Sequence, residues 1–185
     1  MEYIKDKLQA ALKPERYRHS LGVCSEAVKL AKRYGADENK AYTTGLLHDC
    51  AKGMSIDEQI NDCYKRGVEL DNIMLKCPAV IHAPLGAAVA AGEYGINDSE
   101  ILEAIRYHTT AKSDMTTLDK IIYLADMIEP SRSFDGVELL RKTAYEDLDT
   151  AVLEAIRQSI FFNLKKNAVI HPKTLEAWND LVKGR

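Results

Sequence analysis

One stretch decides the fold of this 185-residue chain, Gly45-Leu46-Leu47-His48-Asp49-Cys50-Ala51-Lys52. It is an apolar, helical run that ends in an adjacent histidine and aspartate. Imidazole and carboxylate groups suit zinc, iron or manganese, and a charged aspartate beside leucines is costly to bury unless it is paired or binds a metal. On its own, the pair also fits a helix-end histidine with a capping aspartate. Two adjacent ligands cannot fill a coordination sphere, so a metal site here needs partners from elsewhere in the chain: His19, His82, His108 and Asp126.

The composition is that of a soluble globular protein, with 46% hydrophobic and 29% charged residues. A length of 185 residues fits one domain with a substantial core, so we expect a single domain over residues 1–185. The net charge of -3 gives no footprint for nucleic acid or membrane binding, although it leaves room for a basic pocket for a phosphorylated small molecule. The longest apolar stretches are too short to span a bilayer, and the N-terminus has no apolar signal core.

The four cysteines are widely spaced and form no paired motif: Cys24, Cys50, Cys63 and Cys77. Free thiols in a reducing cytoplasm are therefore expected, and a zinc site built on cysteines is not. Cys50 follows the His-Asp pair but has no base partner in the sequence, so it is not assigned as a nucleophile. The chain also has no glycine-lysine phosphate loop and no serine-centred nucleophile motif.

Helical periodicity runs through almost the whole chain, and no alternating run predicts a sheet. We expect a compact all-α bundle of nine or ten helices, with a short helical piece near residues 71–76. The expected helices cover about residues 2–12, 15–34, 38–50, 56–66, 84–95, 98–108, 118–129, 136–145 and 147–166, and a last helix begins at Pro172.

Three local features refine these boundaries. Ala83 precedes a proline and is disfavoured in helical geometry, so His82 is expected just before a helix that Pro84 opens. Asn97 and Glu100 are typical of a capping box. Asp119 is interpreted as an exposed first-turn acid that favours the helix dipole, although it also suits a carboxylate that orients a metal-bound histidine.

The order His … His-Asp … His … His … Asp resembles the HD-domain superfamily of metal-dependent phosphohydrolases over about residues 15–132. Residues 136–185 are then expected to form C-terminal helices that pack on this HD core. Six short sequence segments are similar to those of the YqeK subgroup, which contains bacterial symmetrical diadenosine tetraphosphate hydrolases. They are Arg16-Tyr17-Arg18-His19-Ser20, Leu47-His48-Asp49-Cys50-Ala51-Lys52, His82-Ala83-Pro84-Leu85-Gly86, Tyr107-His108-Thr109-Thr110, Leu124-Ala125-Asp126-Met127-Ile128-Glu129-Pro130-Ser131-Arg132 and Ile170-His171-Pro172-Lys173-Thr174.

The resemblance implies a site for one or two iron ions. It assigns the first metal to four residues: His19, His48, Asp49 and Asp126. The second metal takes His82 and His108, with Asp49 bridging, although these two histidines also suit a contact with phosphate. Nitrogen and oxygen ligands alone equally tolerate manganese, cobalt or zinc.

The expected reaction follows from this ligand chemistry. A metal lowers the pKa of bound water from about 15.7 to near 7, so a metal-bound hydroxide can attack a phosphorus of the tetraphosphate bridge in line and release two ADP. Asp49, His82 and His108 are the expected catalytic residues. Nucleotide and phosphate contacts are expected from Arg16, Lys52, His82, His108, Thr109, Arg132, His171, Lys173 and Thr174. For the cations among them, the alternative is a solvated surface side chain, and for His171 an exposed residue before a helix.

Two other functions remain open at this point. One is an HD hydrolase of another nucleotide, such as a deoxynucleoside triphosphate or a cyclic dinucleotide, although the short chain without a fused sensor domain argues against a signalling phosphodiesterase. The other is a nucleotide-binding sensor that keeps the metal but turns over negligibly. In each case the expected partner is a small-molecule nucleotide, with no nucleic acid and no membrane, and the chain is compatible with a homodimer.

Overall fold

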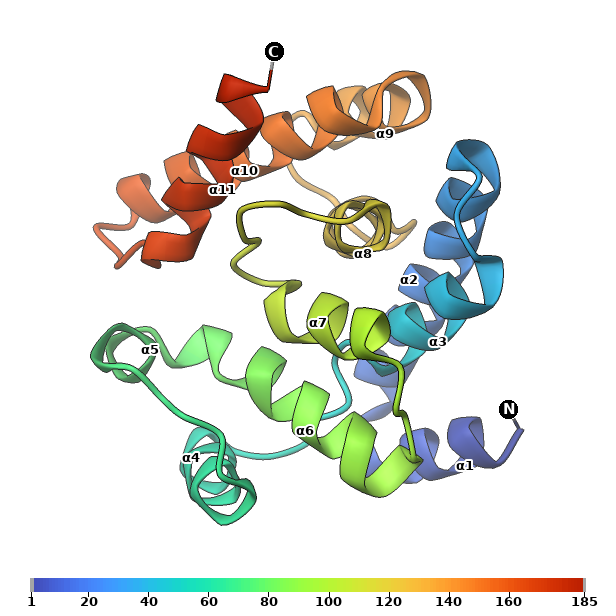
Figure 1. Cartoon of the computed structure of the whole chain (residues 1–185), viewed down its shortest axis with the longest axis vertical. Helices are drawn as coiled ribbons and strands as arrows, with labels where there is room; N and C mark the ends of the chain where they lie inside the picture. The colour runs from blue at the N-terminus through green and yellow to red at the C-terminus, as the bar shows by residue number, and fades with distance from the viewer. Residues whose placement is uncertain (1, 185) are drawn as a thin grey trace.

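A computed structural model describes residues 2–184, which form helices joined by short loops (Figure 1). These residues contain eleven α-helices and no strand, which confirms the all-α prediction. In chain order the elements are α1 (Glu2–Ala11), α2 (Pro14–Tyr34), α3 (Glu38–Leu47), α4 (Ile56–Arg66), α5 (Asn72–Lys76), the 3-10 turn η1 (Pro78–Val80), α6 (His82–Tyr94), α7 (Ser99–Tyr107), α8 (Thr117–Ile128), α9 (Val137–Glu146), α10 (Leu148–Lys165) and α11 (Pro172–Lys183). The count exceeds the expected nine or ten because the short piece near residues 71–76 forms a helix of its own, α5.

Helix α8 is the central element of the fold. It packs against α2, α3, α7, α9 and α10, and Figure 1 shows it end-on near the middle of the molecule. Its run of Ile121, Ile122, Leu124 and Ala125 is fully buried. Burying one such aliphatic side chain contributes about 1.5–3 kcal/mol, so this apolar run favours the central position. Asp126 is carried into the interior by the same helix.

Helices α2 and α3 form the closest pair in the fold, and a glycine makes the contact possible. A Cβ added at Gly45 would lie 2.8 Å from the Cα of Cys24, so any side chain there would push the helices apart. Because His19 lies on α2 and His48 caps the C-terminal end of α3, this close contact brings the two histidines together.

Two predicted helix starts differ from the structure. His82 is the first residue of α6 rather than the residue before it. Pro84 then lies in the first turn, where its missing N–H leaves no hydrogen bond unmade, so Ala83 is helical despite preceding a proline. Helix α7 is capped by Asp98, not Asn97: the Asp98 carboxylate accepts hydrogen bonds from the backbone N–H groups of the next turn, including Glu100 at 2.9 Å.

The three C-terminal helices lie together on one side of α8 (Figure 1). The loop before α8 is tied to α11 by two hydrogen bonds. Thr174 Oγ1 donates to the Thr110 carbonyl at 2.8 Å, and the Asp114 N–H donates to Asp180 Oδ2 at 2.8 Å. Among the described residues, none of the helices is both long enough and apolar enough to cross a membrane.

Candidate metal centre

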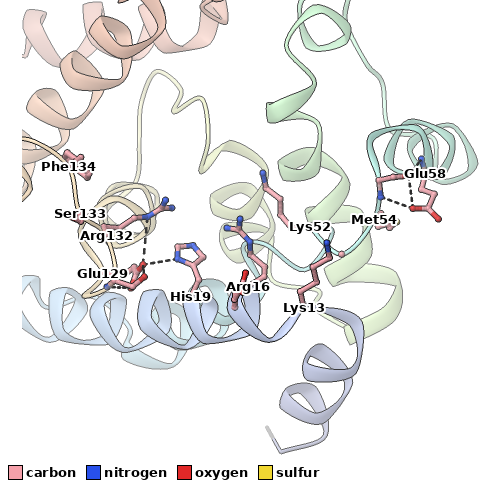
Figure 2. Close-up of a pocket in the computed structure, with 14 residues that line it drawn as sticks. Lys13, Arg16, His19, Lys52, Met54, Glu58, Glu129, Arg132, Ser133 and Phe134 are labelled. Carbon is pink, nitrogen blue, oxygen red and sulfur yellow. Dashed lines mark hydrogen bonds and ion pairs between the residues drawn. The ribbon is translucent and has the colours of Figure 1, made fainter. Parts of the chain in front are cut away.

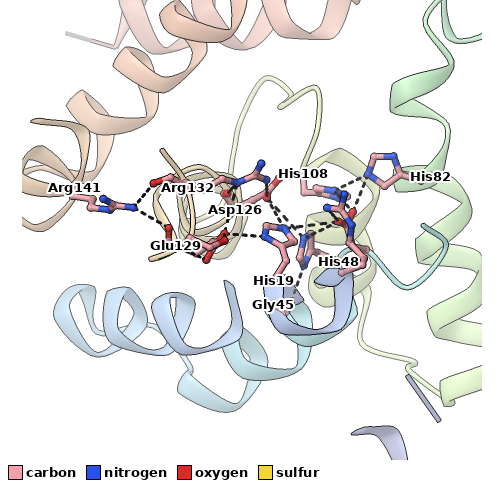
Figure 3. Close-up of polar contacts among 12 residues, drawn as sticks. His19, Gly45, His48, His82, His108, Asp126, Glu129, Arg132 and Arg141 are labelled. Atoms are coloured by element: carbon pink, nitrogen blue, oxygen red, sulfur yellow. Dashed lines mark hydrogen bonds and ion pairs between the residues drawn. The ribbon is translucent and has the colours of Figure 1, made fainter. Parts of the chain in front are cut away.

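Five separate segments bring their histidine and aspartate side chains to one point in the interior (Figure 3). Helix α2, the turn after α3, the start of α6, the end of α7 and the last turn of α8 each contribute. The converging residues are His19, His48, Asp49, His82, His108 and Asp126. All six candidates that the sequence singled out for metal binding therefore meet, although as many as 107 positions (126 − 19) separate them along the chain.

One half of the centre lies between α2, α3 and α8. His19 Nε2 is 3.0 Å from Asp126 Oδ1 and 3.8 Å from Asp49 Oδ2. His48 Nε2 is 3.5 Å from Asp49 Oδ2 and 4.0 Å from Asp126 Oδ1. Donor atoms of His19, His48 and Asp126 all lie within 4.8 Å of one another, which is close enough for one cation to bind all three.

The other half lies on the opposite side of Asp49. His82 Nε2 is 3.1 Å from Asp49 Oδ1, and His108 Nε2 is 3.5 Å from the same oxygen. The two imidazoles lie 3.1 Å apart at their Nε2 atoms. Thus one carboxylate oxygen of Asp49 faces His82 and His108, and the other faces His19 and His48. This is the arrangement that a carboxylate shared by two cations requires.

The second ring nitrogen of three histidines is held by an acceptor. His48 Nδ1 donates to the Gly45 carbonyl at 2.7 Å, and His108 Nδ1 donates to the Ile105 carbonyl at 2.7 Å. A carbonyl only accepts, so the proton is on Nδ1 and the Nε2 lone pair faces the centre. For His19, the acceptor is Glu129 Oε1 at 3.0 Å.

The chemistry of the donor set fits a metal ion. The buried Nε2 atoms of His19 and His48 have no hydrogen-bond partner, although carboxylate oxygens lie nearby. Buried polar atoms are nearly always paired, so two inward-facing orphan nitrogens need an explanation. Neutral imidazole and carboxylate together suit a first-row transition metal, and a cation at the shared point would satisfy both nitrogens.

The local electrostatics favour the metal-binding forms of Asp49 and His82. At His48, burial is outweighed by the carboxylates of Asp49 and Asp126, which raise the pKa of this imidazole. Burial favours a raised pKa for Asp49, but His48, His108 and His82 outweigh it and hold the pKa well below its usual range. Burial lowers the pKa of His82 to about 4, against the opposing effect of Asp49, so this imidazole is neutral near pH 7. An ionised carboxylate and a neutral imidazole are the forms that bind metals.

A cleft of about 880 Å³ opens beside the centre, with His19 in its wall (Figure 2). We call it the basic cleft, because four cations line it, Lys13, Arg16, Lys52 and Arg132, and outnumber its three carboxylates, Glu15, Glu58 and Glu129. Two of them reach the centre directly. Arg16 Nη1 donates to Asp49 Oδ2 at 2.8 Å, and Arg132 forms an ion pair with Asp126. Burial lowers the pKa of Lys52, as expected for an ammonium group partly withdrawn from water.

The other predicted nucleotide contacts lie outside the lining of the basic cleft. His171 is buried, caps α11 and lies 3.3 Å from Asp71 Oδ2, so the alternative of an exposed histidine is wrong. Lys173 lies over the ring of Tyr107, the residue before His108. Thr109 is half-buried beside His108, and Thr174 is bound to the next carbonyl, that of Thr110.

Two acidic residues differ from what the sequence suggested. Asp119 is buried rather than exposed: its carboxylate accepts from the Thr116 N–H at 2.9 Å and pairs with Lys112, so it completes the capping box that Thr116 begins at α8. Glu129, 2% exposed, was missed. Its position in the sequence could have identified it, because an acid at the C-terminal end of a predicted helix interacts unfavourably with the helix dipole and needs a compensating partner. That partner is His19.

The thiol of Cys50 does not take part in the centre. Its Sγ donates to the Gly86 carbonyl at 3.3 Å, which directs the sulfur toward α6. Burial, followed by the nearby charge of Asp49, raises its pKa to about 12, so it is a neutral thiol near pH 7. A thiol in this state is not a nucleophile, in agreement with the sequence interpretation.

Comparison with known proteins identifies the family of the chain. A family model described as the HD domain matches residues 16–131. The chain is 42% identical to a protein of Halalkalibacterium halodurans named bis(5'-nucleosyl)-tetraphosphatase, symmetrical, over 92% of this chain and 91% of the relative. A Bacillus subtilis protein of the same name is 40% identical, over 94% and 92%.

A solved structure agrees with the HD family match and shares the fold. The crystal structure of a "predicted HD superfamily hydrolase involved in NAD metabolism" from Clostridium acetobutylicum matches with a TM-score of 0.96 and 41% identity, and the match covers 100% of this chain and 97% of that one. This chain therefore belongs to the HD domain family, within the group whose members are named symmetrical bis(5'-nucleosyl)-tetraphosphatases.

Proposed function

We propose that this protein is a metal-dependent hydrolase that cleaves diadenosine tetraphosphate symmetrically into two ADP. The observation that carries the proposal is Asp49, whose two oxygens face two separate pairs of histidines, one of which, His19, lines the basic cleft. The relatives named as symmetrical tetraphosphatases, at 42% and 40% identity, supply the substrate.

The proposed ligands follow the two halves of the centre. His19, His48, Asp49 and Asp126 hold the first cation, and His82 and His108 hold the second, with Asp49 shared. We propose iron, with manganese, cobalt or zinc as substitutes that the same nitrogen and oxygen donors accept. When bound, the cations neutralise phosphate charge and lower the pKa of a coordinated water toward 7. The alternative for His82 and His108 is a direct contact with phosphate.

The shape of the basic cleft suits a long substrate cut at its middle. Figure 2 shows Phe134 at one end of the lining and Met54 and Glu58 at the other, with His19 and Arg16 between them. A dinucleotide that lies along this cleft would place its central phosphates at the metal centre and one nucleoside toward each end. Cleavage at the centre then divides the substrate into equal halves.

The cationic side chains hold the phosphate chain during this reaction. Arg16, Lys52 and Arg132 line the basic cleft beside the centre and can donate to non-bridging phosphate oxygens. Water forms a bond to one of the two central phosphorus atoms, and the anhydride bond from that phosphorus to the bridging oxygen breaks. The bridging oxygen leaves with the second ADP, and the water's protons are released to solvent.

The C-terminal segment gives a second set of proposed contacts. Lys173 lies over Tyr107 and Thr174 is bound to Thr110, so the start of α11 adjoins the segment that carries His108. We propose that Thr109, His171, Lys173 and Thr174 contact the nucleotide once it is bound. His171 reaches it only if its contact with Asp71 opens.

A product assay with a measured metal content tests the proposal. The purified protein is analysed for iron, manganese, cobalt and zinc, and then incubated with diadenosine tetraphosphate, deoxynucleoside triphosphates, cyclic dinucleotides and NAD. ADP as the sole product from the tetraphosphate supports symmetrical cleavage, and ATP with AMP contradicts it. Faster turnover of another nucleotide supports a different HD hydrolase, and tight binding without turnover supports a sensor.

We further propose that the chain works as one domain in the cytoplasm, with an HD core near residues 15–132 and the helices of residues 136–185 packed on it. The cysteines are unpaired among the described residues, as a reducing compartment favours. Size-exclusion chromatography with light scattering distinguishes a monomer from a homodimer.

A further inference from the structure

We infer that Glu129 is a positioning residue that orients His19 and sets the affinity for the cation, and that residue 22 is a glycine to make room for it. The inference rests on the metal centre of the proposed function but not on its substrate. Neither residue was singled out by the sequence patterns, and neither faces the shared point at which the six candidate ligands meet.

The contact between Glu129 and His19 fixes the tautomer of the imidazole. His19 Nδ1 donates to Glu129 Oε1 at 3.0 Å, and both side chains are nearly buried. A carboxylate holds the proton on Nδ1 and leaves the Nε2 lone pair toward Asp126. A carboxylate partner also makes the imidazole a stronger donor to a cation than a carbonyl partner does. At Nδ1, His48 and His108 have carbonyl partners instead.

The carboxylate of Glu129 is held in turn by its own segment. The Ser131 N–H donates to Oε2 at 2.8 Å, and the Ser131 hydroxyl donates to Oε1. The backbone of this segment is held separately by Arg141, which donates to the carbonyls of Ile128, Glu129 and Arg132 at 2.9, 3.0 and 2.9 Å. A substitution at the side chain of Glu129 therefore leaves the backbone bonds to Arg141 in place.

Gly22 lies one turn after His19 on α2 and faces the same carboxylate. A Cβ at this position would lie 2.7 Å from Glu129 Oε2. Oε2 is the far end of a flexible side chain and would shift away from the added Cβ, which disturbs the hydrogen bonds that the carboxylate makes with Ser131 and His19. Glycine in the interior of a helix is less stable than alanine, so the need for space at Glu129 accounts for its presence here.

The first test compares metal affinity in single variants. Manganese and cobalt ions are titrated into metal-free protein by calorimetry, and the visible spectrum of bound cobalt reports the coordination. Glu129→Ala and Gly22→Ala should each weaken metal binding by about 10–100-fold. Glu129→Gln retains an acceptor for His19 without the charge, so its metal affinity should fall less than that of Glu129→Ala. Helix content by circular dichroism verifies that each variant is folded.

A double-variant cycle tests whether Gly22 acts through Glu129. Once Glu129 is alanine, the clash at residue 22 disappears, so Gly22→Ala should add no further loss of affinity. Losses that multiply in the double variant would show that Gly22 acts independently and would overturn that part of the inference. Full metal affinity in Glu129→Ala would overturn the role of Glu129 itself.

Matched controls separate positioning from general destabilisation. Glu26 is also buried on α2, where it accepts from the Tyr145 hydroxyl at 2.6 Å, and Glu26→Gln should lower stability but not metal affinity. Gly92→Ala is the control for Gly22, because its added Cβ meets only the guanidinium of Arg66 at 3.2 Å. A wild-type protein that binds no metal would overturn the inference together with the metal centre. A wild-type protein that binds metal but leaves diadenosine tetraphosphate intact would refute only the proposed substrate.

Discussion

Nη1 of Arg16 lies 2.8 Å from Oδ2 of Asp49, across 33 positions of the chain. The Asp49 side chain is 3% exposed and that of Arg16 is 38% exposed, so the pair joins the interior of the centre to the basic cleft. One end of this ion pair contacts the histidines, and the other is accessible to a ligand. Arg16 is therefore positioned to contact the phosphates that the centre would cleave.

Replacing Arg16 should affect the substrate more than the metal. A guanidinium binds two phosphate oxygens in a planar fork that lysine cannot reproduce. Arg16→Lys is expected to lower kcat/KM for diadenosine tetraphosphate by about 10-fold, and Arg16→Ala by about 100-fold, which matches one or two charge-assisted hydrogen bonds. Steady-state kinetics with metal analysis measures both effects. Arg18→Ala, an exposed site on the same helix, is the control, and loss of metal from Arg16→Ala would contradict a phosphate role.

Asp49→Ala should abolish activity and remove metal from both halves of the centre. Asp49 is the one residue among the six whose carboxylate contacts histidines on both sides, so no neighbour replaces it. The helical fold should persist, because the side chain is held by polar contacts and not by the apolar core. Elemental analysis and circular dichroism of the variant provide the measurement. Asp57→Ala, an exposed acid on α4, is the control, and a metal-loaded, active Asp49→Ala would refute the assignment.

Lys52→Ala should weaken nucleotide binding without changing the metal content. The ammonium group is partly buried in the basic cleft, where burial lowers its pKa, and it is one turn beyond the His-Asp pair. A rise in KM of about 10-fold is expected for the loss of one charged hydrogen bond to phosphate. Binding of a non-hydrolysable analogue, measured by calorimetry, gives the affinity directly. The exposed Lys65 provides the matched control Lys65→Ala. An equal loss of nucleotide affinity in Lys52→Ala and Lys65→Ala would argue for a general charge effect.

Leu140→Ala tests whether the C-terminal helices belong to one cooperative unit. Leu140 on α9 is fully buried, so its truncation should cost about 2–5 kcal/mol of unfolding free energy. In a single domain, the whole protein should unfold in one transition at a lower denaturant midpoint. The neighbouring Leu139 is 66% exposed, and Leu139→Ala should change stability by less than about 0.5 kcal/mol. Two separate transitions in Leu140→Ala would mean that the C-terminal helices unfold independently.

Local patterns in the sequence predicted much of the fold. Periodicity of apolar residues identified the helices because burial of one face is a property of neighbouring turns. The errors came where two local rules competed. Pro84 was expected to open its helix, but a proline fits equally well two residues later in the first turn, so α6 begins at His82. Asp98 rather than Asn97 caps α7, since both side chains are competent caps and only the local backbone geometry decides between them.

The sequence by itself determined the helical class and identified the six residues that meet at the centre. Both follow from the types of residues and their order along the chain. Only the tertiary structure decided how these residues face one another. The contact of Glu129 with His19 spans 110 positions, and it exists because α2 and the end of α8 pack side by side. A hydrogen bond between distant residues depends on packing to within a fraction of an ångström, and helical periodicity, which describes one segment at a time, does not contain that information.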